Sequence, residues 1–186
     1  MTEFDKMISG QSFDGGAHEI SVIRDRATAL MGELNYALED DKREVLLQRL
    51  FRHFGEGSVV RPPFSCEFGE TVSIGDNTFI NMNALMLDGA PISIGSNVLI
   101  GPNAHFYTAG HPLDYRRRRS WETRCLPIVV ENDVWIGGNV VISQGVTIGA
   151  RSVIAANSVV TRDVPCDSLF GGSPAKLIRR IEENFE

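Results

Sequence analysis

The sequence contains little cysteine, and the cysteines it has form no pattern. Cys66, Cys125 and Cys166 are scattered, odd in number and never spaced as a CxxC pair. A disulfide framework or a cysteine zinc site needs cysteines in pairs or at regular spacing. We therefore expect reduced thiols, no metal site and a cytoplasmic location.

Targeting segments and a basic surface are also missing. No apolar run approaches the roughly 18 residues of a membrane-spanning helix. Residues 1–5 contain no basic stretch leading into an apolar one, so we expect no secretory signal. A formal net charge of -6 disfavours nucleic acid as a partner, because domains that bind it usually present a basic face.

What the sequence does have is a six-residue period between residues 130 and 164. An aliphatic residue falls on every sixth position, and a small or β-branched residue follows four places later. Helices repeat at about 3.6 residues and flat strands at about 2, so this period indicates a solenoid with three short sides per coil. With a coil of about 18 residues, Ile148 should stack on Val130. The expected inward column is Val130, Ile136, Ile142, Ile148, Ile154 and Val160.

Earlier repeats are less regular and are followed by an interruption. Aliphatic residues recur six apart from residue 74 to 86, the count slips by two, and the period resumes at residues 94 and 100. Residues 107–126 are polar and without period, so we interpret them as a protruding loop, and such long loops are usually functional. Its Arg116–Arg119 run is expected to be a solvated face or, alternatively, to meet a phosphate or acidic acceptor on a neighbouring subunit.

The two ends of the chain read as helical. Within residues 1–57, the apolar spacing predicts a short helix near residues 3–9, an amphipathic helix over 19–38, and a third helix with Phe51 and Phe54 on its apolar face. We expect these helices to cover the first coil, although a contact with an acceptor is an alternative role. The domains are then a helical cap (1–57), the β-helix (58–165) with its loop 107–126, and a C-terminal turn and helix (166–186). Ser173 would cap that last helix, from Ala175 to about residue 183.

Several further motifs accompany the repeats. They are Met-Ile-Ser-Gly at 7–10, Thr-Ala-Gly-His-Pro at 108–112, Asn-Asp-Val-Trp-Ile-Gly-Gly at 132–138, Gly-Val-Thr-Ile-Gly at 145–149 and Gly-Gly-Ser-Pro-Ala-Lys at 171–176. Together they resemble the maltose and galactoside O-acetyltransferases, within the hexapeptide-repeat acyltransferase superfamily, over nearly the whole chain. The resemblance implies a mainly β fold, a single-stranded left-handed parallel β-helix. It also implies a homotrimer with acetyl-CoA as cosubstrate and active sites between subunits.

His111 is the expected general base. An alcohol is a poor nucleophile at neutral pH, and imidazole has an unperturbed pKa suited to taking its proton. Pro112 favours an extended backbone at His111, and Gly110 lets the loop turn just before it. The position matches the general base of the resembling enzymes.

Three polar residues match acceptor contacts of the resembling enzymes. Asn81 is expected to hold the acceptor and to help orient the reacting groups, since an amide donates and accepts hydrogen bonds at once. Asparagine is also favoured at a solenoid corner for its left-handed geometry. Asp88 is expected as an acidic acceptor contact, although galactoside enzymes carry paired aspartates where this chain has Asp88-Gly89. Asp14 is expected to supply a further carboxylate from the N-terminal segment.

The resemblance also assigns contacts for the coenzyme. The small residues would let the pantetheine arm lie flush along the coils, and two cations on one face of the predicted C-terminal helix would suit the phosphates. The matching positions are Trp135, Gly138, Ala156, Thr161, Lys176 and Arg179.

The expected chemistry is direct transfer from acetyl-CoA to a hydroxyl of a sugar or glycoside. An acyl-cysteine route is disfavoured because no cysteine of the repeats accompanies the histidine loop. The acceptor could instead be serine, an antibiotic or a sugar-nucleotide amine. Two alternatives from other classes are a zinc carbonic anhydrase, which needs three clustered histidines where only His105 and His111 are near each other in sequence, and a non-catalytic scaffold with the same fold.

Overall fold

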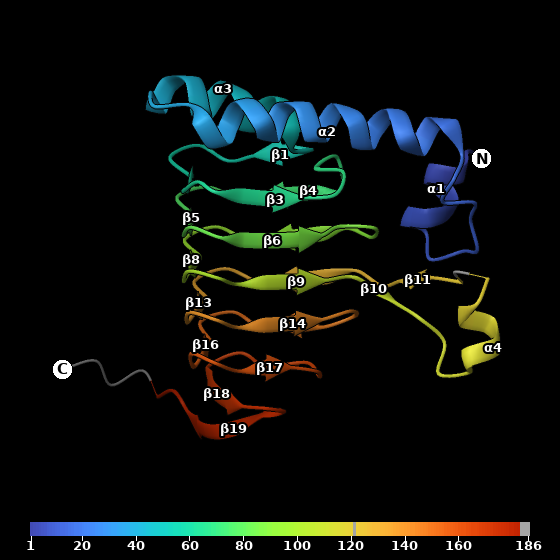
Figure 1. Ribbon diagram of the computed structural model, residues 1–186. Coiled ribbons are helices and arrows are strands. Elements are labelled where there is room, and N and C mark those ends of the chain that lie inside the picture. The colour runs from blue at the N-terminus through green and yellow to red at the C-terminus, as the bar shows by residue number, and fades with distance from the viewer. Residues whose placement is uncertain (121, 183–186) are drawn as a thin grey trace.

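The computed structural model describes residues 1–182 apart from position 121. The chain forms a parallel β-solenoid whose N-terminal end is covered by helices (Figure 1). Its first sheet has the order β1 (His53–Phe54), β4 (Val72–Ile74), β7 (Ile92–Ile94), β12 (Ile128–Val130) and β15 (Thr147–Ile148). The second runs β2 (Val59–Val60), β5 (Phe79–Ile80), β8 (Leu99–Ile100), β13 (Trp135–Ile136), β16 (Val153–Ile154), β18 (Ser168–Gly172) and β19 (Ala175–Arg180). The third runs β3 (Phe64–Cys66), β6 (Ala84–Leu87), β9 (His105–Tyr107), β14 (Val141–Ser143) and β17 (Val159–Val160).

The register of the strands confirms the six-residue period. Val130 pairs with Ile148, and the pairs Ile136–Ile154 and Ile142–Val160 follow in the other two sheets. All six side chains are buried in one continuous core. The aliphatic column therefore fills the interior of the prism, as the spacing predicts.

Helices cover the first coil. They are α1 (Glu3–Ile8), α2 (His18–Tyr36) and α3 (Asp40–Leu50). Asn35 of α2 completes the open edge of β3, because its amide donates to the Phe64 carbonyl at 2.9 Å and accepts from the Phe64 N–H at 2.8 Å. Such pairing leaves the backbone of the first coil without an exposed edge at this point.

The expected end of the third helix was wrong. Helix α3 ends at Leu50, and Phe54 lies in strand β1, which pairs with β4 of the next coil. The solenoid thus begins at His53, inside the segment expected to be helical. The physical reason is that the backbone of β4 offers hydrogen-bond partners that the sequence pattern does not reveal.

The predicted C-terminal helix was also wrong. Residues 175–180 form strand β19, which pairs antiparallel with β18 after a turn in which Gly172 has φ +101°. The part of the prediction at residue 183 lies outside the described residues. Strand β18 would otherwise leave the edge of the last coil open, and β19 fills that edge with backbone hydrogen bonds. Helical spacing of the aliphatic residues was overridden by this tertiary contact.

Residues 107–126 leave the solenoid as a protruding hairpin. Strands β10 (Ala109–Gly110) and β11 (Arg124–Cys125) pair at its neck, and the short helix α4 (Tyr115–Arg118) lies at its tip. Figure 1 shows this loop on the same side as α1 and opposite the corner that joins β5 to β6.

Within the described residues, no helix is long and apolar enough to span a bilayer.

Candidate active site

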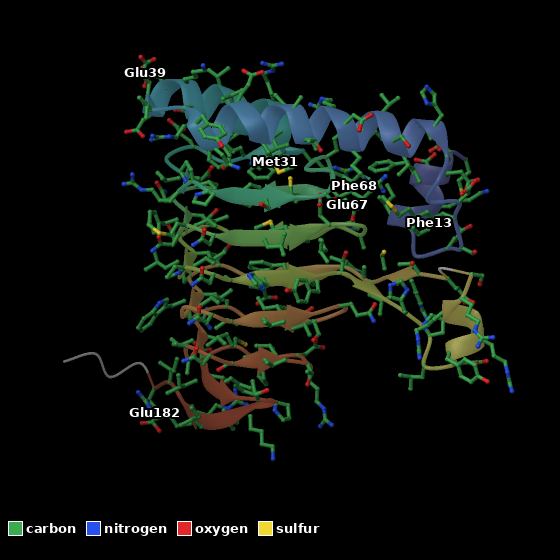
Figure 2. The ribbon with its side chains drawn as sticks, in the orientation of Figure 1. Phe13, Met31, Glu39, Glu67, Phe68 and Glu182 are labelled. Carbon is green, nitrogen blue, oxygen red and sulfur yellow. The ribbon has the colours of Figure 1, made fainter. Side chains whose placement is uncertain are left out.

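A cavity of about 850 Å³ lies between the helical head, the first coils and the protruding loop. Its walls combine the segment between α1 and α2, the end of the coil after β3, and both strands of the loop neck. Figure 2 shows Phe13 on the first of these walls and Glu67 and Phe68 on the second. The lining includes Met7, Ser12, Phe13, Asp14, Arg24, Glu67, Phe68, Gly89, Ala109, His111, Ser120, Glu122, Thr123 and Cys125.

His111 lines this cavity directly after strand β10. Its Nδ1 lies 2.9 Å from the backbone carbonyl oxygen of Glu122. A carbonyl can only accept, so Nδ1 must carry the proton and donate it to this bond. The imidazole is therefore held in the tautomer whose Nε2 has a free lone pair. That nitrogen can accept a proton from a hydroxyl in the cavity.

The neck of the loop is tied to the solenoid by Gln144, at the corner after β14. With its amide oriented to satisfy both of its polar atoms, the Gln144 nitrogen donates to the carbonyls of Thr108 at 3.3 Å and Arg124 at 3.2 Å. A Cβ at Gly110 would overlap the terminal amide of Gln144, so glycine at this position leaves room for that side chain. The residue before His111 is thereby seated against the next coil.

Asp14, which the resemblance assigns as an acceptor carboxylate, lines the same cavity as His111. Its Oδ1 accepts the Gly16 N–H at 2.9 Å, and its own N–H donates to Glu3 at 2.7 Å. The turn between α1 and α2 thus holds the carboxylate at the cavity wall. The pKa of Glu3 is lowered by its bond with Lys6 and then by the Asp14 N–H.

Sequence reasoning missed three residues on the opposite wall. Arg24 of α2 donates to Glu67 at 3.0 Å, and its guanidinium carbon lies 5.3 Å from the ring centroid of Phe68. These side chains build the wall from an ion pair that lies over a buried aromatic ring. No motif marked them, because they meet only when the helical head folds over the first coil.

The expectation for Asp88 was wrong. Its side chain is fully buried, and its carboxylate accepts backbone N–H groups of Glu67 at 2.7 Å, Phe68 at 3.0 Å and Gly69 at 2.7 Å. The Thr71 hydroxyl adds a fourth bond at 2.7 Å. A carboxylate occupied in this way shapes the turn behind the cavity wall and leaves no oxygen for an acceptor.

Gly89, the neighbour of Asp88, lines the cavity instead. A Cβ at Gly89 would lie 2.7 Å from the Cys125 sulfur, so the thiol occupies the space that a side chain at position 89 would need. The departure from paired aspartates therefore changes the cavity wall itself.

Cys125 contradicts the expectation that no cysteine accompanies the histidine loop, on which the case against an acyl-cysteine route was based. Strand β11 places it opposite Ala109, two residues before His111, so a cysteine does accompany the histidine loop. Burial, with a smaller contribution from the charge of Glu67, raises the pKa of Cys125 to about 11. At neutral pH it is a protonated thiol and a weak nucleophile.

Asn81 lies away from the cavity of its own chain. It follows β5, at the corner where the second sheet turns into the third, while the loop that carries His111 leaves β9 at the other end of the third sheet. Its Oδ1 accepts the neighbouring Met82 N–H at 2.8 Å. One chain by itself does not bring Asn81 and His111 together.

The expected coenzyme contacts also fall on separate parts of the solenoid. Trp135 stands on the outer face of the second sheet, 56% exposed, between Leu99 and Val153 in register. Gly138 and Ala156 share the Asn81 corner in successive coils, and the Gly138 carbonyl accepts the N–H of residue 157 at 2.9 Å.

The other three lie elsewhere. Thr161 follows β17, at the end of the third sheet where the histidine loop leaves β9. Lys176 and Arg179 are exposed on strand β19, so the helical spacing that placed them on one face does not apply.

The arrangement can support proton transfer to and from a polar ligand. It combines an oriented imidazole with carboxylates and aromatic rings in one cavity of suitable size for a small ligand. In the described part of the chain, no three His, Cys, Asp or Glu side chains gather as a metal site.

Comparisons with known proteins agree with this architecture. Residues 6–55 match the maltose acetyltransferase hexapeptide capping motif, and residues 127–162 match the six-repeat bacterial transferase hexapeptide. Residues 91–108 match the hexapeptide repeat of succinyl-transferase.

Whole-chain similarities extend the match. A hexapeptide-repeat acetyltransferase of Vibrio cholerae O1 biovar eltor, solved in complex with acetyl coenzyme A, is 60% identical with a TM-score of 0.95, over 98% of this chain and 100% of that one. A maltose O-acetyltransferase of Clostridium difficile 630 is 38% identical with a TM-score of 0.96, over 98% and 99%. The galactoside O-acetyltransferase of Escherichia coli K12 is 38% identical over 185 residues, 98% of this chain and 90% of that protein.

Proposed function

Since this chain belongs to the maltose/galactoside O-acetyltransferase family and is an acetyltransferase, we propose that it transfers the acetyl group of acetyl-CoA to a hydroxyl of a sugar or glycoside. The observation that carries the proposal is the hydrogen bond from His111 Nδ1 to the Glu122 carbonyl inside the cavity. It leaves Nε2 as a base with a defined lone pair.

His111 acts twice, first as a base toward the acceptor hydroxyl and then as an acid toward the leaving thiolate. Its Nε2 takes the proton of the acceptor hydroxyl, and the hydroxyl oxygen attacks the thioester carbonyl carbon. The carbon–sulfur bond then breaks, and the same nitrogen returns the proton to the sulfur of coenzyme A. A backbone N–H near the carbonyl oxygen would stabilise the negative charge that develops on it.

The cavity wall favours an acceptor rich in hydroxyls. Asp14 and Glu67 provide carboxylate oxygens that accept hydrogen bonds from hydroxyls, and the partly exposed ring of Phe13 provides a face for the apolar side of a sugar ring. Gly89 and Cys125 occupy the position where galactoside enzymes carry a second aspartate. We therefore expect an acceptor preference different from that of galactoside enzymes.

The complete site is proposed to form between copies of the chain in a homotrimer. The outer positions of the first sheet are largely polar, whereas those of the second carry Val59, Phe79, Leu99, Trp135 and Val153. Exposed apolar columns of this kind indicate a covered interface. Placing the Asn81 corner of one copy against the His111 edge of the next would bring the two residues into one site.

The same interface would form the coenzyme groove. Gly138 and Ala156 lie on the Asn81 corner and Thr161 on the His111 edge, so facing copies would supply both walls. Trp135 would flank the groove, while Lys176 and Arg179 would offer cations to the coenzyme phosphates.

The test is release of coenzyme A, followed with a thiol reagent over a panel of glucose, maltose, galactosides and amine acceptors. His111→Ala should lower turnover on a sugar at least about a hundredfold, as expected for a positioned base. His53→Ala is the matched control, because His53 is exposed on β1 and lies outside the cavity. Full turnover by His111→Ala would refute the base assignment. Acetyl-CoA binding without turnover on any sugar would refute the acceptor class.

A further inference from the structure

Two arginines of the run Arg116–Arg119 at the loop tip contact the chain on either side of His111. We propose that Arg117 and Arg118 are positioning residues, which hold the two loop segments beside His111 and so fix its Nδ1–Glu122 hydrogen bond. The proposal rests on His111 being the base of the proposed function. Its structural part, the hold on the imidazole, can be tested separately.

Arg117 holds the loop segment that leads into strand β11 and back toward the solenoid. Its Nε donates to Glu122 Oε2 at 2.8 Å, and its Nη2 donates to the other carboxylate oxygen of Glu122. This bidentate geometry fixes the orientation of both partners, unlike a single point contact. The bond with Arg117 lowers the pKa of Glu122 and raises that of Arg117, so the contact favours the charged form of each partner.

The carboxylate that Arg117 holds belongs to the residue that orients the base. Glu122 presents its side chain to Arg117 and its backbone carbonyl to His111 Nδ1, at 2.9 Å. A peptide held by its own side chain has less freedom to swing, so its carbonyl stays directed at the imidazole. If the carbonyl moves away, the hydrogen bond that selects between the two neutral tautomers of His111 is lost.

Arg118 holds the loop segment that directly follows His111. Its Nη1 donates to the carbonyls of Pro112 at 2.9 Å and Leu113 at 2.7 Å, the two residues directly after His111. Asp114 begins helix α4 by accepting the Arg116 N–H at 2.9 Å, which sets the helix that carries both clamping arginines. One short helix therefore contacts the chain on each side of the imidazole.

The other two arginines of the run do not take part in these contacts. Arg116 and Arg119 lie over the ring of Tyr115, at 5.4 and 5.1 Å from its centroid. Arg116 is exposed and lies outside the cavity lining. It offers a control with the same charge, in the same helix, whose side chain has no contact to the loop segments beside His111.

The experiment combines histidine-selective ¹⁵N spectra with steady-state kinetics on the full-length protein. The chain has four histidines, and His111→Ala identifies the signal of His111 by difference. We expect a single Nδ1–H tautomer of His111 in the parent protein and a mixture in Arg117→Ala. Arg117→Ala and Arg118→Ala should lower kcat roughly tenfold, since a displaced catalytic group loses rate. The KM for acetyl-CoA should not change, and Arg116→Ala should match the parent in both.

A charge exchange separates the clamp from a loss of folding. Arg117→Glu and Glu122→Arg should each lower kcat, and the double variant should recover most of it by restoring the pair. Arg117→Lys should keep only part of the parent kcat, because an ammonium group cannot bind both carboxylate oxygens in bidentate geometry.

The outcomes are distinguishable. If His111→Ala loses turnover while both arginine variants keep the parent kcat and a single tautomer, the clamp is refuted and the base stands. If His111→Ala keeps turnover, the base assignment of the proposed function fails, and the tautomer spectra of the arginine variants still decide the clamp. Equal losses in Arg116→Ala would also overturn it, because they would reflect net charge alone.

Discussion

Asp88→Asn tests whether the buried carboxylate is a structural anchor. The parent side chain accepts three backbone N–H bonds and one hydroxyl bond while fully buried. An asparagine amide nitrogen in place of Oδ2 would point a donor at the Gly69 N–H and leave that group unpaired. An orphaned buried donor costs roughly 1–3 kcal/mol, and the remaining bonds lose their charge assistance. We expect a loss of about 3 kcal/mol in the free energy of unfolding.

The assay is urea unfolding at one fixed protein concentration, because the stability of an oligomer depends on concentration. Asp76→Asn is the matched control. Asp76 is exposed at a corner and accepts one backbone N–H, from Glu56 at 2.9 Å, so it should lose less than about 1 kcal/mol. Parent-like stability of Asp88→Asn together with a raised KM for the acceptor would refute the reasoning, and would return Asp88 to the acceptor contacts expected from sequence.

Three further predictions follow from single contacts. Gly55→Ala should lower the free energy of unfolding by about 3 kcal/mol, since its Cβ would lie 2.3 Å from a backbone carbon of the next coil. Gly32→Ala should raise it by about 0.8 kcal/mol, because no atom lies near the new Cβ in helix α2 and alanine favours the helix. Urea unfolding checks both. In the folded protein a thiol reagent should react fast with exposed Cys166 alone, and with all three cysteines after denaturation. Arg151 donates to Asp167 at 2.6 Å and lowers the pKa of that carboxyl group. The contribution of this pair to folding stability is therefore full above about pH 4 and is lost as the pH falls through the lowered pKa of Asp167. In Arg151→Ala, an NMR titration should find the pKa of Asp167 raised relative to the parent.

The repeat was readable because each coil repeats the same local requirement. Val130, Ile142 and Ile154 had to point inward whatever lay around the solenoid, and a period of six admits few other arrangements. The cap was readable in part, because amphipathic spacing marks helices α2 and α3. Their ends were less predictable, since strand β1 forms only where β4 offers an edge.

The ends and the site depended on contacts distant in sequence. Residues 175–180 have helical spacing, yet the open edge of β18 makes them a strand. Asp88 looked like a ligand-binding carboxylate, and its burial by residues 67–71 could not be seen from its neighbours in sequence. The arginine run looked like a solvated face, because only the fold places Glu122 between Arg117 and His111.

The sequence by itself determined the solenoid, its register and the identity of the histidine loop, because these depend on spacings within about one coil. Only the tertiary structure decided what surrounds His111. Asp14, Glu67 and Cys125 come from three separate segments, and the cavity exists only where the helical head, the first coils and the loop meet. Periodic local patterns fix how neighbouring coils stack, whereas a site built from distant segments is fixed by packing that no short pattern encodes.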